Sequence, residues 1–181
     1  MSRKNFIIIG SIVALIQLLV PAWMIYQKEL VVQKGTTYLF PIAPVDPHDP
    51  FRGKYIYLNF KNTSFNSVFP LNVKYGDPVY AIIDKDAEGK VIIEKLRTKP
   101  PKVADSYFKA KVSFSDSNHI SIDYPFNVFY MEEFKAVKAE EVYRKNVTSK
   151  GNAFAVVKIY KGESTIIDVI INGKSIVELS Q

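Results

Sequence analysis

The chain has 181 residues, of which 24 are lysine or arginine, 18 are aspartate or glutamate and none is cysteine. The absence of cysteine excludes thiol catalysis, thiolate metal sites and disulfides, so a folded domain must depend on its hydrophobic core. Without Arg3 and Lys4 near the N-terminus, the formal net charge of +6 falls to +4, which is too mild, and its charges too evenly interleaved, for a nucleic-acid-binding protein.

An uncharged segment, residues 6–26, comes first. A helix needs roughly 20 apolar residues to cross the hydrocarbon core of a bilayer. A cleaved signal peptide is the alternative, but its apolar region covers only about 7–15 residues and ends in small residues. Here the segment is longer and ends with bulky residues such as Trp23 and Met24. The sequence therefore predicts an uncleaved signal anchor over residues 6–26, a tail over 1–5 and one domain over 27–181.

The charges beside this segment predict its orientation. Arg3 and Lys4 precede it, whereas Lys28 after it is offset by Glu29. Because basic residues favour the cytoplasmic side, we expect the N-terminus in the cytoplasm. The protein would then lie in a bacterial inner membrane with its domain in the periplasm or otherwise outside the cytoplasm.

Three residues predict a packing face on this helix. Gly10, Ala14 and Gln17 are spaced so that they share one face. Small residues let a second helix approach closely, and a glutamine amide can form a hydrogen bond between helices. We expect this face to pack on a polytopic membrane-protein partner. The alternative is that single glycine and glutamine residues are simply tolerated in a lone span.

Strand patterns dominate the rest of the chain. Alternating or β-branched segments, separated by turn residues, predict an antiparallel, mainly β domain. In residues 54–60 one face would carry Tyr55, Tyr57 and Asn59, and in residues 107–114 Phe114 would face the core with the other alternate apolar residues. The predicted strands are 36–42, 54–60, 78–84, 90–96, 107–114, 119–124, 153–160, 164–171 and 174–179.

Two local signals complete the predicted fold. Asn172 and Gly173 indicate a type I′ hairpin turn, which needs positive φ at both positions. Residues 132–146 are rich in helix formers, with acidic residues first and Arg144 and Lys145 last, which suits the helix dipole. We therefore expect one helix late in a β-rich α+β domain, with Phe134, Val137, Glu141 and Val142 spaced so that apolar residues share a face.

Residues 53–60 (GKYIYLNF) resemble the motif that names the GDYXXLXY family of bacterial membrane-anchored proteins. Lys54 stands where the family name has Asp, and Phe60 where it has Tyr. The preceding residues 44–53 fit the lead-in P-x-D-P-x-D-x-x-R-G. The resemblance extends over the whole chain, including the anchor. It implies this topology and a role beside polytopic membrane proteins, and it implies no particular reaction.

The motif segment has two possible roles. Three prolines limit its backbone, and Asp46 and Asp49 can cap turns while Arg52 bridges them, which is typical of an architectural corner. The same residues could instead form a binding loop. The candidate residues of this motif or loop are Asp46, His48, Asp49, Arg52, Gly53, Tyr55, Leu58 and Phe60.

No pattern indicates catalysis or a cofactor. Signal-peptidase-like hydrolases need Ser-Met-x-Pro after the anchor, and neither that motif nor G-x-S-x-G, a P-loop or H-E-x-x-H occurs. The carboxylates and imidazole of residues 46–49 lack the spacing of a metal site. We expect a non-enzymatic accessory subunit that docks on a membrane or periplasmic partner. The alternative is a small-molecule or glycan-binding module with a pocket lined by Tyr55, Tyr57, Tyr75 and Tyr80.

Overall fold

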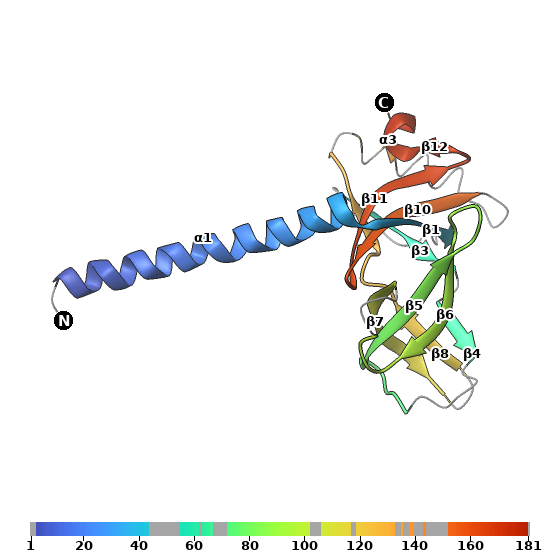
Figure 1. Ribbon diagram of the computed structural model, residues 1–181. Coiled ribbons are helices and arrows are strands. Elements are labelled where there is room, and N and C mark those ends of the chain that lie inside the picture. Colours follow the sequence, from blue (N-terminus) through green and yellow to red (C-terminus); the bar gives the residue numbers. More distant parts are fainter. Residues whose placement is uncertain are drawn as a thin grey trace.

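The computed structural model describes residues 3–43, 55–61, 63–66, 72–101, 106–116, 119–132, 135, 138–139, 143 and 152–180. A long helix, α1 (Arg3–Lys34), projects from a β-rich domain (Figure 1). The other elements are β1 (Thr36–Ala43), β2 (Tyr55–Tyr57), β3 (Asn59–Phe60), β4 (Ser64–Asn66), β5 (Pro78–Lys85), β6 (Val91–Arg97), β7 (Tyr107–Ser115), β8 (His119–Asp123), β9 (Val128–Tyr130), β10 (Ala153–Tyr160), β11 (Glu163–Ile171), β12 (Lys174–Ser175) and α3 (Ile176–Leu179).

These strands form three antiparallel sheets among the described residues. One has the order β12-β11-β10-β1-β3, another the order β4-β8-β7-β5-β6, and a small one pairs β2 with β9. Two backbone contacts connect the larger sheets: Leu39 of β1 lies against Lys90, and Phe108 of β7 against Gly162. The predicted fold class, a mainly β domain after an apolar N-terminal helix, is confirmed.

Helix α1 continues eight residues beyond the predicted span and leads directly into the domain. Its last turns pack on β10 and β11, where the side chain of Val31 is buried. The Lys158 ammonium of β10 donates a hydrogen bond to the Val32 carbonyl, and the Gly35 N–H donates to the Val31 carbonyl at 2.9 Å. Only one residue, Gly35, separates α1 from β1, so the helix is joined to the sheet without a linker.

An aromatic core lies between the two large sheets. Phe40 of β1 is 1% exposed and contacts Phe108 of β7 at a ring-centroid distance of 5.8 Å. It also contacts Phe126 at 4.9 Å, Tyr124 at 5.7 Å and Phe60 of β3 at 6.0 Å. These edge-to-face contacts suit aromatic quadrupoles. Phe40 therefore holds together three segments that are far apart in sequence.

The hairpin turns follow from local sequence. Asn172 and Gly173 both have positive φ, 51° and 83°, which confirms the turn predicted between β11 and β12. Lys161 and Gly162 have φ of 50° and 84° and form a turn of the same kind between β10 and β11. Gly89, with φ of 80°, lies in the hairpin loop between β5 and β6.

One expected core residue lies outside the core. The β7–β8 register shifts between Val112 and Phe114, because a bulge changes the alternation of inward and outward side chains. Val112 is buried as expected, but Phe114 is 54% exposed. The prediction that Phe114 faces the core is wrong for this reason.

The last predicted strand is mostly a helix. β12 contains only Lys174 and Ser175, and α3 follows at once. The Ser175 hydroxyl accepts a hydrogen bond from the Val177 N–H at 3.2 Å. Serine is a preferred N-cap because it satisfies a free N–H of the first turn. The prediction of a strand over 174–179 is therefore correct only for Lys174 and Ser175, and residues 176–179 form a helix instead.

The predicted helix over 132–146 is described only in part. Lys135, Lys138, Ala139 and Tyr143 have helical backbones, and Ala139 and Tyr143 are buried in the core. Phe134, Val137, Glu141 and Val142 lie outside the described residues.

Candidate functional site

The motif strand crosses from the small sheet to a large one. Tyr55 pairs with Tyr130 of β9, whereas Phe60 pairs with Ile42 of β1. Between them, the Leu58 N–H donates to the Asn127 carbonyl at 2.8 Å. The predicted alternation is confirmed here, because Ile56 and Leu58 are buried while Tyr57 is 46% exposed. Phe60 is half-buried against the aromatic core.

An exposed tyrosine cluster, Tyr55, Tyr57 and Tyr130, lies on the small sheet. The Tyr55 ring is 5.3 Å from the Tyr57 ring and 5.7 Å from the Tyr130 ring, both edge-to-face. Tyr130 is 72% exposed. Sequence reasoning identified Tyr55 and Tyr57, but Tyr130 joins them only through the β2–β9 pairing, which the sequence does not signal.

The two ends of the motif loop are tied by Tyr143. Its hydroxyl donates a hydrogen bond to the Ala43 carbonyl at 3.1 Å and accepts one from the Asn59 backbone N–H. Ala43 and Asn59 are paired residues of β1 and β3. Burial raises the pKa of the Tyr143 phenol well above its ordinary value of 10, so this phenol stays protonated and remains a donor. Tyr143 thereby joins the strand that enters the loop to the strand that follows it.

Tyr143→Phe should destabilise the domain. The substitution keeps the ring in place but removes the hydrogen bond to the partly buried Ala43 carbonyl, whose net loss costs about 0.5–1.5 kcal/mol. Urea unfolding of the full chain in detergent, followed by circular dichroism of the β domain, measures the loss. Tyr75→Phe is the matched control, because Tyr75 is 82% exposed. An unchanged midpoint for Tyr143→Phe would contradict this account of the loop.

The loop itself is not part of the described chain. Asp46, His48, Asp49, Arg52 and Gly53 lie outside the described residues. The choice between an architectural corner and a binding loop therefore remains a prediction from sequence.

Of the four tyrosines considered for a small-molecule pocket, Tyr55 and Tyr57 are neighbours on β2, whereas Tyr75 and Tyr80 lie before and on β5. Tyr80 lies 5.9 Å from Tyr107 on the β5–β7 pair, and Tyr75 lies in the turn before β5. Two surface hollows of about 380 and 400 Å³ adjoin Tyr124, which lines both. None of Tyr55, Tyr57, Tyr75 and Tyr80 lines either hollow.

Acidic and imidazole side chains do not converge in the described part of the chain. No group of three or more His, Asp or Glu residues that could hold a metal ion occurs there. His119 lies exposed on β8, and its backbone N–H donates to the Asp116 carboxylate at 2.6 Å.

Helix α1 exposes its apolar segment along its length. It is long and apolar enough to cross a membrane, and none of that segment is buried against the domain. Gly10, Ala14 and Gln17 are all exposed, and a Cβ atom at Gly10 would meet nothing within 4 Å.

Comparison with known proteins agrees with the motif. The model of the family described as GDYXXLXY protein matches residues 17–169, which include the second half of the apolar segment and most of the domain. No curated protein and no solved structure matches the chain. The chain belongs to the GDYXXLXY protein family.

Proposed function

We propose that this protein is a non-enzymatic, single-pass envelope protein whose β domain docks on a membrane or periplasmic partner as an accessory subunit. The observation that carries the proposal is the exposed tyrosine cluster of β2 and β9, of which Tyr55 and Tyr57 belong to the family motif. Tyrosine is enriched at protein interfaces because its ring supplies apolar area while its hydroxyl supplies a hydrogen bond.

The construction of the cluster supports a docking role. Buried Ile56 and Phe129 on the inner face of the same two strands hold the β2–β9 pair on the domain. The three tyrosine rings are held against one another by edge contacts. Side chains that are ordered before binding lose little conformational entropy when a partner covers them. A pre-ordered aromatic surface outside any described pocket suits a protein partner better than a small ligand, which is normally enclosed by a pocket.

The apolar helix offers a second contact surface. Gly10, Ala14 and Gln17 present small side chains and one amide on a single exposed face of α1. An interhelical hydrogen bond from Gln17 would be worth roughly 1 kcal/mol. The same partner can thus be held within the bilayer and above it.

The orientation of the helix is part of the proposal. Arg3 and Lys4 would keep the N-terminus in the cytoplasm. A reporter that is active only outside the cytoplasm should therefore work when fused after Gln181. Activity of a cytoplasm-only reporter at the same position would contradict the orientation.

The docking role is tested by affinity capture from detergent-solubilised membranes. We expect the wild-type chain to capture one stoichiometric polytopic partner. Tyr57→Ser combined with Tyr130→Ser should reduce recovery of this partner about tenfold, because the double variant loses two aromatic side chains that anchor the interface. Tyr75→Ser is the matched control, because it removes an exposed tyrosine outside the cluster. Equal recovery with both variants would contradict docking through the cluster.

A second comparison separates the helix from the domain. Gly10→Ile, Ala14→Ile and Gln17→Leu together should loosen the complex while leaving the chain in the membrane. Ala22→Ile, on another face of α1, is the control. Full recovery with the triple variant would leave docking to the β domain alone, and absence of any partner would favour a ligand-binding module.

A further inference from the structure

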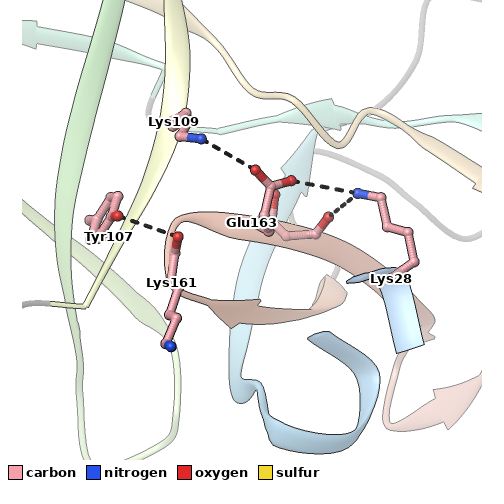
Figure 2. A network of polar contacts seen from close by, with 6 residues as sticks. Lys28, Tyr107, Lys109, Lys161 and Glu163 are labelled. Atoms are coloured by element: carbon pink, nitrogen blue, oxygen red, sulfur yellow. Dashed lines mark hydrogen bonds and ion pairs between the residues drawn. The ribbon is translucent and has the colours of Figure 1, made fainter. Parts of the chain in front are cut away.

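A basic cluster surrounds the junction of α1 with the domain: Lys28, Lys34, Lys109, Lys158 and Lys161. Figure 2 shows Lys28 of α1 and Lys109 of β7 converging on Glu163, at the start of β11. The Glu163 carboxylate lies 3.9 Å from the Lys28 ammonium and 3.3 Å from the Lys109 ammonium. The Glu163 carboxylate therefore forms ion pairs with two ammonium groups.

The positive charge of the cluster is only partly neutralised. Lys28 and Lys109 share the single carboxylate of Glu163, so one of these two positive charges is left over. The side chains of Lys28 and Lys109 are 61% and 55% exposed, and exposed ion pairs of this kind are weak. Their ammonium groups are therefore available to additional anions.

The β10–β11 turn carries Lys161 on a rigid support. The Tyr107 hydroxyl donates a hydrogen bond to the Lys161 carbonyl at 3.3 Å, as Figure 2 shows, and Gly162 packs directly on the Tyr107 ring. The Lys161 ammonium lies over the Tyr160 ring, 5.4 Å from its centroid. The turn thus presents an exposed cation beside a half-buried tyrosine.

The position of α1 brings this turn close to the bilayer. The uncharged segment ends at Tyr26, whose ring lies 6.0 Å from that of Trp23, and such aromatic pairs favour the membrane interface. Lys28 follows after two residues, a rise of about 3 Å. The Lys28 ammonium also donates a hydrogen bond to the Ser164 carbonyl at 3.4 Å. The start of β11 is therefore separated from the end of the apolar segment by no more than the length of the Lys28 side chain and this short rise.

We propose that the basic cluster binds anionic phospholipid headgroups of the membrane that holds α1, with Lys161 and Tyr160 at the point of contact. The inference rests on the membrane anchoring of the proposed function and adds a second, lateral contact of the domain with the bilayer. Lysine charges at a membrane surface attract anionic lipids over distances of about a Debye length, roughly 8–10 Å. Tyrosine suits the same layer because its ring is apolar and its hydroxyl polar.

The first experiment measures the distance of the turn from the lipid headgroups. The chain has no cysteine, so Lys161→Cys gives a single site for a fluorescent label in the full-length protein. Ala87→Cys is the matched control, because the β5–β6 loop meets β1 at Leu39, five residues beyond the end of α1 at Lys34. Both labelled proteins are placed in nanodiscs of phosphatidylglycerol and phosphatidylcholine that contain headgroup nitroxide lipids.

The label at residue 161 should be quenched about twofold more strongly than the label at residue 87, because only the former reaches the headgroup layer. Equal quenching at the two positions would overturn the proposal.

The second experiment tests the charge. Hydrogen exchange at the β10–β11 turn should be about threefold slower in phosphatidylglycerol-containing nanodiscs than in pure phosphatidylcholine, since only the former attract the cluster. Lys161→Glu should abolish this difference, whereas Lys95→Glu, on exposed β6, should preserve it. A difference that survives Lys161→Glu, or none in the wild type, would contradict lipid binding.

These outcomes are independent of the docking role. Both experiments use the purified protein without a partner, so failure here leaves affinity capture unaffected. A chain that is not retained in nanodiscs at all would instead refute the anchoring on which both proposals depend.

Discussion

Phe40→Ala should lower the free energy of unfolding of the β domain by about 3–5 kcal/mol, the usual cost of truncating a buried phenylalanine. Phe40 is almost fully buried and contacts four aromatic rings from β3, β7 and the segment between β8 and β9. The neighbouring rings come from β3, from β7 and from the segment between β8 and β9, so they cannot close the resulting cavity without movement of the backbone. The loss should therefore lie at the upper end of this range.

Denaturant unfolding of the full chain in detergent measures this effect. Phe114→Ala is the matched control, because Phe114 is the same residue type on β7 but more than half exposed beyond the bulge. It should change the free energy of unfolding by no more than about 0.5 kcal/mol, as is usual at the surface. Similar losses for the two variants would show that the aromatic core does not unite the sheets.

Gly162→Ala should destabilise the protein by about 2–5 kcal/mol, from two separable causes. An alanine at a φ of 84° costs about 1–2 kcal/mol, because its Cβ crowds the backbone in the left-handed region. The added Cβ would also lie 2.9 Å from Cζ of Tyr107, and such overpacking adds about 1–3 kcal/mol.

Gly173→Ala isolates the backbone contribution. Gly173 has nearly the same φ, 83°, in a turn of the same kind, but nothing lies within 4 Å of its added Cβ. The same unfolding experiment should therefore give a loss of only about 1–2 kcal/mol. If the two alanine variants lose equal stability, the contact between the β10–β11 turn and Tyr107 has no energetic role.

The parts of the fold that depend on nearby residues could be predicted from sequence. β10, β11 and the β5–β6 hairpin follow from alternation and turn chemistry, and Asn172 and Gly173 adopt the φ values that their turn requires. These signals are complete within a few residues. The family motif was likewise readable, because it is a contiguous segment.

Features that depend on distant partners could not be predicted. The extension of α1 to Lys34 is stabilised by burial of Val31 and by Lys158, which lies 126 residues away from its Val32 partner. The bulge before Phe114 arises from the pairing register of β7 with β8. The sequence of β7 alone alternates regularly and therefore does not indicate it. In the candidate site, Tyr130 and Tyr143 meet the motif only through tertiary pairing, so neither of them was among the candidate residues predicted from sequence.

Because α1 joins β1 directly, a rotation of the helix is transmitted to the whole β domain. Membrane helices tilt by about 20° on average, and by up to about 40°. With no flexible linker to absorb this rotation, a 20° tilt would displace a point about 30 Å from the pivot, roughly the diameter of such a domain, by about 10 Å. In the proposed membrane setting, a change of bilayer thickness or helix packing that tilts α1 would therefore displace the tyrosine cluster laterally, since only Gly35 separates the helix from β1.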